Sequence, residues 1–344
     1  MSELGMNDLS LSRWLPDRAA LTPDRVAIDF GGRLISYAEL AGAAAARAAA
    51  FAALGLKPGD RVATLARNCP EQVAVFFACA QAGLILVPLN WRLMAAELAY
   101  QIGDSDPAVL LTDPALEALG KEAALSACRV ESLLTEPAPA EAAPEVAVSG
   151  EDPLLILYTS GTTGRPKGAV LTHANCFWTN LSLDRTAEIT GGDVVLQVLP
   201  QCHVGGWNVQ PLLAWWKGAT VVLEQAFDAA RVLDLIQEKK IATMMGVPTN
   251  YQMLAARPEF GQADLSSLRR VIGVPDERWG ETGLAFVVFA PGQETVEAEL
   301  AEFCRERLAR YKVPGRFRVL AELPRVTSGK IDKVSLRSML EAGE

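Results

Sequence analysis

Histidine is scarce in this sequence: His173 and His203 are the two present in 344 residues. The six cysteines form no Cys-x-x-Cys pair, which argues against a structural zinc site and against a disulfide framework. No Lys/Arg-rich run offsets the formal net charge of −9, so we expect no nucleic-acid surface. The longest apolar run, residues 73–89, is interrupted by Gln81 and Gly83 and is too short to span a bilayer.

The N-terminus also lacks the features of a secretory signal. Its first 15 residues have no basic start followed by an apolar core, and they include Glu3 and Asp8. Half of all residues are apolar, and a chain of this length can bury a large core, usually in two or more domains. We therefore expect a soluble, cytoplasmic, globular protein.

Short apolar segments alternate with helical segments, which is typical of a layered α/β fold. The pattern predicts strands at 25–30, 34–36, 61–66, 84–89, 108–112, 129–134, 154–158, 194–199, 219–223, 241–246, 268–272, 284–290 and 317–320. It predicts helices at 37–54, 70–83, 95–102, 115–127, 172–180, 209–216, 228–239, 248–256 and 295–311. Residues 136–152, rich in Pro, Ala and Glu, are predicted to form an exposed connection. We place no catalytic residue in the first 135 residues.

A run of ten residues, 159–168, follows the predicted buried strand 154–158 and consists of glycine, hydroxyl and basic residues except for Pro166. Its glycines let backbone N–H groups approach an anion, its hydroxyls add donors, and Arg165 and Lys167 add positive charge. Pro166 stands where the common mononucleotide loop has glycine, so this loop is of another class. A Gly/Thr surface turn is the alternative, but so long a run after a buried strand favours phosphate binding. The predicted phosphate contacts are Thr159, Ser160, Gly161, Thr162, Thr163, Gly164 and Lys167.

The same stretch, YTSGTTGRPKGAVLTHAN, resembles the phosphate loop of the adenylate-forming superfamily of acyl-CoA synthetases, adenylation domains and luciferases. Three further stretches agree with the family in its order: LPQCHVGG at 199–206, VPDERWGE at 274–281 and PRVTSGKIDK at 324–333. The N-terminal RVATLARNCPEQVAVFFACAQAG is most similar to the acyl-CoA synthetase branch.

The resemblance implies a large α/β domain of layered sheets with flanking helices, at 1–272, and a small α+β domain at 273–344. It implies an AMP-forming acid:CoA ligase whose carboxylic acid, fatty or aromatic, attacks ATP to form an acyl-adenylate and pyrophosphate. The thiol of CoA then displaces AMP. ATP, Mg²⁺ and CoA are the implied substrates and cofactor.

The resemblance also implies roles for four single residues. Lys330 matches the catalytic lysine, whose ammonium neutralises charge during attack on the α-phosphate, although a lysine beside glycine on a polar loop is usually only solvated. His203 matches the family's gate at the acyl pocket, with a hydrogen-bonded core histidine as the alternative. Trp207 and Gly246 match pocket-lining positions, and ordinary core is the alternative for both.

The chain departs from the family after Ile272. The turn for adenine, the glutamate that helps to hold magnesium, the aspartate for ribose and the hinge are absent, so we infer a missing block of roughly 150 residues near 272–273. We therefore assign no metal ligand and expect weakened ATP affinity, because several hydrogen bonds to charged groups are lost together. An inactive remnant with residual nucleotide or acyl binding is the main alternative, and an ATP-binding interaction module is another.

Overall fold

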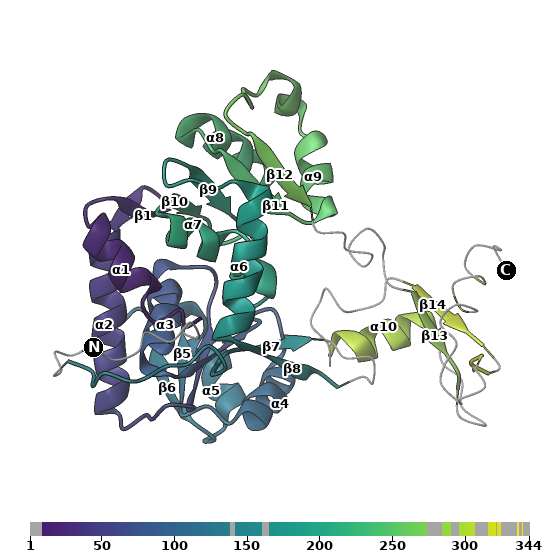
Figure 1. The fold of residues 1–344 in the computed structure, drawn as a ribbon. Coiled ribbons are helices and arrows are strands. Elements are labelled where there is room, and N and C mark those ends of the chain that lie inside the picture. The colour runs from purple at the N-terminus through teal and green to yellow at the C-terminus, as the bar shows by residue number, and fades with distance from the viewer. Residues whose placement is uncertain are drawn as a thin grey trace. The chain divides into compact units, whose positions relative to one another are not determined.

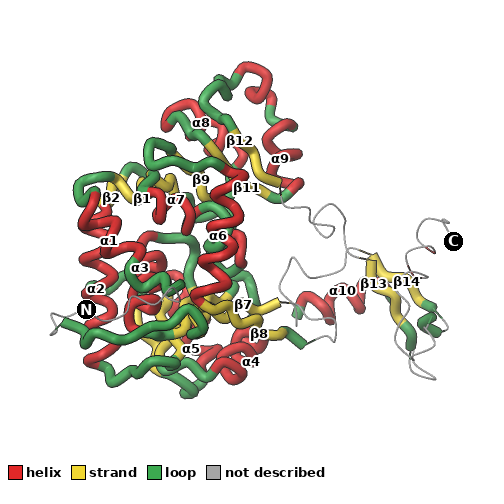
Figure 2. Tube along the Cα trace, viewed as in Figure 1, coloured by secondary structure: helices red, strands yellow, loops and turns green. Residues whose placement is uncertain are grey.

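The computed structural model describes residues 9–137, 142–159, 165–273, 284–289, 296–306, 316–320, 322–324, 336 and 339. The chain divides into two compact units, residues 1–276 and 277–344. Figure 1 traces the chain through both units, and Figure 2 distinguishes helices from strands. The first unit consists of β-sheets flanked by helices, as the sequence predicts.

One sheet of the first unit is wound from successive strand–helix–strand units. Its strands lie in the order β6-β5-β3-β4-β7-β8, and all are parallel except β8, which is antiparallel to β7. Helical segments connect β3 to β4, β4 to β5 and β5 to β6, as parallel strands require. The strands are β3 (Arg61–Leu65), β4 (Ile85–Leu89), β5 (Val109–Thr112), β6 (Arg129–Ser132), β7 (Pro153–Thr159) and β8 (Lys167–Thr172). The helices are α3 (Pro70–Ala82), α4 (Ala95–Ser105), η1 (Pro114–Leu116) and α5 (Glu117–Ala124).

The other sheet combines the start of the chain with residues 194–273. Its order is β12-β11-β9-β10-β1-β2, parallel except for the hairpin β1–β2. The strands are β1 (Val26–Phe30), β2 (Arg33–Ser36), β9 (Val194–Gln197), β10 (Thr220–Leu223), β11 (Thr243–Gly246) and β12 (Arg270–Gly273). The helices are α1 (Trp14–Leu21), α2 (Tyr37–Ala53), α6 (His173–Ala187), η2 (Val204–Gly206), α7 (Pro211–Lys217), α8 (Ala229–Lys239), α9 (Pro248–Ala255) and η3 (Pro258–Gln262).

Side chains at helix ends explain why the helices begin where they do. Ser36 accepts a hydrogen bond from the backbone N–H of Glu39, and the Glu39 carboxylate accepts one from Ser36 N–H, a capping box that starts α2. Thr172 caps α6 in the same way with Asn175. Gly83 ends α3 in the left-handed conformation, with φ of +65°.

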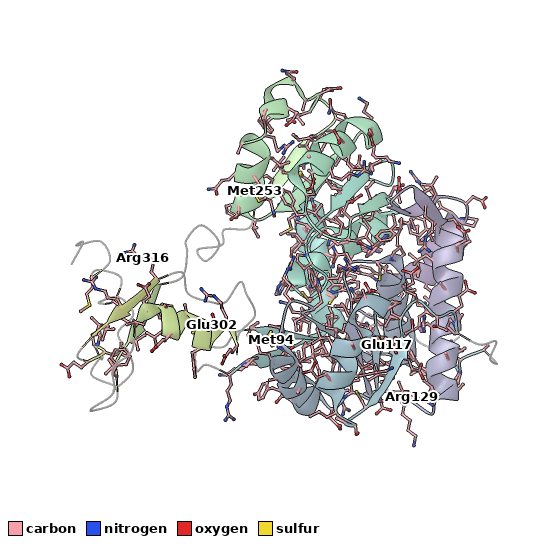
Figure 3. All side chains as sticks on the ribbon, turned by 180° about the vertical axis from the view of Figure 1, so that it is seen from behind. Met94, Glu117, Arg129, Met253, Glu302 and Arg316 are labelled. Atoms are coloured by element: carbon pink, nitrogen blue, oxygen red, sulfur yellow. The ribbon has the colours of Figure 1, made fainter. Side chains whose placement is uncertain are left out.

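Helix α3 is the centre of the core. Ten of its 13 residues are buried, as expected for a helix that is apolar on every side. Phe76 stacks on Trp207 with 4.9 Å between ring centroids, and Phe77 packs edge-on against Trp215 at 5.9 Å. One helix thus connects packing from both sheets, and Figure 3 shows side chains throughout this unit.

Helices α1 and η3 lie where the sequence predicts no element, and two further segments of the first unit differ from the prediction. Lys167 begins strand β8, because residues 167–172 pair with β7, whereas the sequence predicts a loop that includes Lys167 and Gly168. Helix α6 continues to Ala187 rather than ending at Asn180. Both differences follow from packing against neighbours distant in sequence or across the hairpin, which outweighs local propensity.

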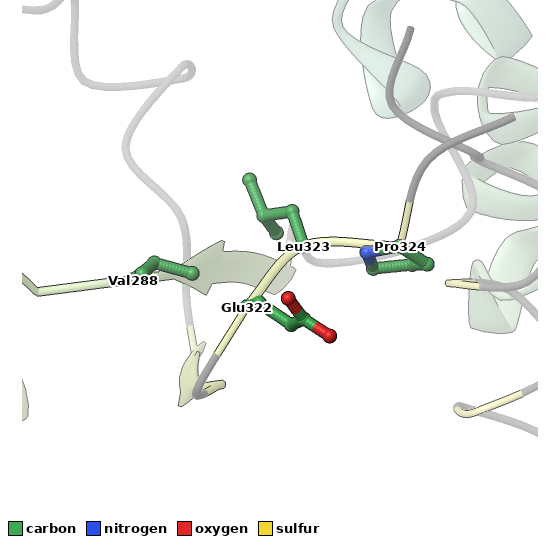
Figure 4. Close-up of a pocket in the computed structure, with 4 residues that line it drawn as sticks. All are labelled: Val288, Glu322, Leu323 and Pro324. Atoms are coloured by element: carbon green, nitrogen blue, oxygen red, sulfur yellow. The ribbon is translucent and has the colours of Figure 1, made fainter. Parts of the chain in front are cut away.

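The second unit contains β13 (Leu284–Val287), α10 (Glu297–Arg305) and β14 (Arg316–Val319), with β13 and β14 parallel. An open pocket in this unit is lined by Val288, Glu322, Leu323 and Pro324 (Figure 4), none of which is a predicted site residue. Within the part of the chain that the structure describes, no helix has the length and apolarity needed to cross a membrane.

Candidate functional site

The predicted phosphate loop joins the two strands of the hairpin β7–β8. Strand pairing ends with Thr159 opposite Lys167, so the loop begins at the carboxyl end of β7 and returns into β8, the edge strand of the sheet. The side chains of Thr159, Arg165 and Lys167 are exposed. Among the described residues, neither of these two cations takes part in an ion pair. The other predicted phosphate contacts, Ser160, Gly161, Thr162, Thr163 and Gly164, lie outside the described residues.

A further cation lies at the carboxyl end of the neighbouring strand β4. Strand β4 pairs in parallel with β7, with Leu86 opposite Leu155, so the carboxyl ends of both strands lie on the same side of the sheet. Beyond the end of β4, the exposed Arg92 guanidinium lies 4.5 Å from the centroid of the Trp91 ring. Ligands of parallel sheets bind at the carboxyl ends of the strands, which makes Arg92 a candidate for this site. Sequence reasoning missed it because only the strand register brings the two segments together.

Buried amides hold residues 199–207, the segment after β9, against the start of α3. The Asn68 side-chain N–H₂ donates to the Leu199 carbonyl at 3.0 Å, and Gln201 N–H donates to Asn68 Oδ1 at 2.9 Å. The Gln72 side chain donates to Gln201 Oε1 at 2.9 Å. All three amide side chains are buried, so these bonds fix the carboxyl end of β9 relative to α3.

The residues predicted to line an acyl pocket occupy different environments. His203 is exposed just before η2, so the alternative of a buried core histidine is wrong. Trp207 is fully buried, and its indole N–H donates to the Gln201 carbonyl, an environment that matches the alternative of ordinary core. Gly246 ends β11 and is buried. Their acyl-pocket role stays a prediction.

The described side chains offer anion binding rather than covalent chemistry. Burial raises the pKa of Cys202 to about 12 although Arg92 opposes the shift, and burial raises the pKa of Cys69 to about 12. Both are therefore neutral thiols at pH 7. Among the described residues, no group of three or more His, Cys, Asp and Glu side chains can hold a metal ion. Lys330, the predicted catalytic lysine, lies outside the described residues.

The layered sheets and the polar hairpin loop at a sheet edge are features of a phosphate-binding α/β protein. The chain belongs to the family of AMP-binding enzymes, whose family model matches residues 15–315. The family predicted from the sequence is thereby confirmed.

Curated relatives include several named ligases. The chain is 39% identical over 295 residues to a feruloyl-CoA synthase of an Amycolatopsis species, a match that covers 82% of this chain and 59% of the relative. It is 38% identical over 278 residues to an indoleacetate–CoA ligase of Aromatoleum aromaticum, covering 76% of this chain and 54% of the relative. The chain thus spans little more than half the length of these relatives, which agrees with the predicted shortening.

Solved structures agree with the fold. A putative long-chain-fatty-acid CoA ligase from Rhodopseudomonas palustris matches with a TM-score of 0.71 and 27% identity, over 78% of this chain and 70% of that one. An o-succinylbenzoate CoA synthetase from Bacillus subtilis matches with a TM-score of 0.80 over 95% of this chain and 98% of that one, and at 21% identity it shows the fold alone.

Proposed function

We propose that this chain is an AMP-forming ligase that activates a carboxylic acid for transfer to coenzyme A. A carboxylate oxygen attacks the α-phosphorus of ATP, a new P–O bond forms, and pyrophosphate leaves with the electrons of the broken P–O bond. The thiolate of CoA then attacks the acyl carbon, and AMP leaves. The observation that supports this reaction most is that Thr159, Arg165 and Lys167, which flank the predicted phosphate loop, are exposed in a chain of the AMP-binding family.

The residues of the chain bind and stabilise charge in this scheme. Backbone N–H groups and hydroxyls of 159–164, together with Lys167, bind the phosphate oxygens of ATP. Lys330 neutralises the charge that develops at the α-phosphate. Magnesium accompanies ATP and takes most of its ligands from phosphate and water. Because no described carboxylate cluster fits the ion, we assign it no protein ligand and no step.

The relatives favour an aromatic acid. Feruloyl-CoA synthase and indoleacetate–CoA ligase are named for acids with aromatic rings, and both are more similar to this chain than a long-chain-fatty-acid–CoA ligase of Mycobacterium tuberculosis, which is 32% identical. In this proposal the exposed His203 contacts the acid, the buried Trp207 and Gly246 support the wall of the acid site from behind, and a fatty acid is the second substrate class.

One observation favours a second candidate, a binding protein without turnover. Strand β12 is the outer strand of its sheet, and 52% of the Val271 surface on it is exposed. An exposed apolar edge strand in a chain that matches 59% of a curated relative is consistent with an incomplete catalytic unit. This candidate binds nucleotide or acid but forms no adenylate.

Acid-dependent ATP–pyrophosphate exchange separates the two candidates. We expect exchange with ferulate or indoleacetate, a weaker signal with a long-chain fatty acid, and none without acid. Lys330→Ala lowers the exchange rate roughly 100-fold, as expected for one charge-stabilising group, and Lys167→Ala raises the KM for ATP. The control Lys121→Ala, which removes an exposed lysine paired with Glu117 on α5, changes neither quantity.

Two other results would contradict one or both candidate functions. Nucleotide binding by calorimetry without exchange for any acid supports the second candidate and contradicts ligase activity. Absence of both binding and exchange contradicts both candidates.

A further inference from the structure

Helix α4 contacts both stems of the phosphate loop, that is, the end of β7 at Tyr158 and the chain that enters β8 at Pro166. Tyr158 is the last but one residue of strand β7, just before the loop. Its hydroxyl donates a hydrogen bond to Asp104 Oδ2 at 2.6 Å and lies 3.1 Å from the Gln101 carbonyl. On the other stem, the Tyr100 hydroxyl donates to the Pro166 carbonyl at 3.4 Å. The loop therefore begins and ends against one helix.

The helix that receives these contacts is itself fixed. Leu98 and Ile102 bury its apolar face. Arg61 of β3 holds its C-terminal end, because Arg61 Nε donates to the Ser105 carbonyl at 2.7 Å and Nη2 pairs with Asp106 Oδ2 at 2.9 Å. The helix that carries Asp104 is thus bonded to β3, a central strand of the sheet.

The position of Asp104 needs an explanation of its own. A carboxylate in the last turn of a helix faces the negative end of the helix dipole, which disfavours it. The phenol of Tyr158 compensates as a hydrogen-bond donor, and burial together with Asp104 raises the pKa of Tyr158, so the donor keeps its proton.

The opposite strand leaves room for this arrangement. A Cβ atom on Gly168 would lie 2.8 Å from Ile156 Cγ2 and 3.4 Å from Tyr158 Cζ. Glycine therefore allows the Tyr158 ring to lie close to β8, while Asp104 holds the hydroxyl from the side of α4. The orientation of this first stem is determined from two sides.

We propose that Asp104 is a positioning residue, which through Tyr158 holds the stem of the phosphate loop in the conformation that binds ATP. The inference rests on the proposed function. Holding the stem before ATP arrives reduces the conformational freedom lost on binding, so the effect is on affinity for ATP. Asp104 has no role in the chemical step, so kcat is unaffected.

Kinetics of pyrophosphate exchange test the proposal. Asp104→Ala and Tyr158→Phe each raise the KM for ATP roughly three- to tenfold, the range expected for one partly exposed hydrogen bond, with kcat and the KM for the acid within about twofold. The double variant is no worse than either single variant, because both remove the same bond. Asp104→Asn, which keeps an acceptor oxygen, recovers part of the loss. The matched control is Asp106→Asn, which keeps an acceptor oxygen for Arg61 and leaves the Arg61 bonds to the Ser105 and Asp106 carbonyls in place, so it leaves the KM unchanged.

Amide hydrogen exchange of the hairpin peptides, measured without nucleotide, gives a readout independent of activity. Exchange in residues 154–159 and 165–172 becomes faster in Asp104→Ala but not in Asp106→Asn. Unchanged hairpin exchange in Asp104→Ala overturns the proposal, as do additive effects of the two single variants on KM. A wild-type protein that binds no ATP contradicts the proposed function instead, and hairpin exchange alone then decides whether Asp104 fixes the stem.

Discussion

The side chain of Asn68 accepts a hydrogen bond from the backbone N–H of Gln201 at 2.9 Å, although the two residues are 133 positions apart. The same side chain donates to the carbonyls of Leu199 and Glu224, each at 3.0 Å. Only 3% of Asn68 and 1% of Gln201 is exposed. One buried amide therefore connects the end of β3 in one sheet to the ends of β9 and β10 in the other.

Removal of this amide should destabilise the first unit. Asn68→Ala removes the acceptor of Gln201 N–H, the side-chain donor to the Glu224 carbonyl and one of two donors to the Leu199 carbonyl. We expect a loss of roughly 2–4 kcal/mol in the free energy of unfolding, measured by urea denaturation. Asn68→Asp keeps the acceptor but turns a carboxylate toward two carbonyls, so we expect at least as large a loss at pH 7 and partial recovery in acid. The control Gln252→Ala, at an exposed amide on α9, should change stability by less than about 0.5 kcal/mol. A similarly small effect of Asn68→Ala would show that the amide is not needed.

Substitution by alanine should change the stability of the protein in opposite directions at two glycines. A Cβ on Gly206 would lie 2.3 Å from the Pro200 carbonyl oxygen and 2.7 Å from Gln201 Cα, so the backbone must move. We expect Gly206→Ala to cost roughly 1–3 kcal/mol. Gly42 is exposed within α2 and has no atom within 4 Å of an added Cβ, so Gly42→Ala should stabilise by roughly 0.5–1 kcal/mol. Thermal unfolding of both variants measures the contrast, and equal shifts in Tm would contradict it.

Glu224 should make stability depend on pH. Burial raises the pKa of this carboxyl above its ordinary 4.5, Arg231 opposes the shift, and Asp29 and Asp228 reinforce it. A raised pKa in the folded state means that the contribution to stability is complete below pH 4.5 and is lost as the pH rises through the folded-state value. Glu224→Gln stays neutral, so between pH 4 and pH 7 the variant should gain stability relative to the wild type, as measured by urea unfolding.

Asp264 provides a control of opposite sign for that experiment. Hydrogen bonds from Ser266 and then Lys240 lower the pKa of its carboxyl to about 2. The contribution of Asp264 is therefore present above its ordinary pKa of 3.8 and is lost as the pH falls toward 2. Asp264→Asn should lose stability relative to the wild type at pH 7 and approach it in acid. The same sign of pH dependence in both variants would refute the assignment for Glu224.

Much of the fold is predictable because its signals are local. The predicted helices 37–54 and 70–83 begin beside Ser36 and Pro70, whose local conformations favour a helix start, and the structure has α2 and α3 there. Strand β8 is different. Residues 167–172 form a strand only because β7 is beside them, and no local pattern indicated it.

By itself, the sequence determined the α/β class, most element positions and the adenylate-forming family, because caps, turns, periodicity and the loop motif are properties of contiguous residues. Only the tertiary structure decided that His203 is exposed, that Arg92 follows the carboxyl end of the strand that pairs with β7, and that Asp104 holds Tyr158. Each of these depends on strand register or helix packing. Such contacts join residues far apart in the chain, and their energies depend on the whole arrangement rather than on any one segment.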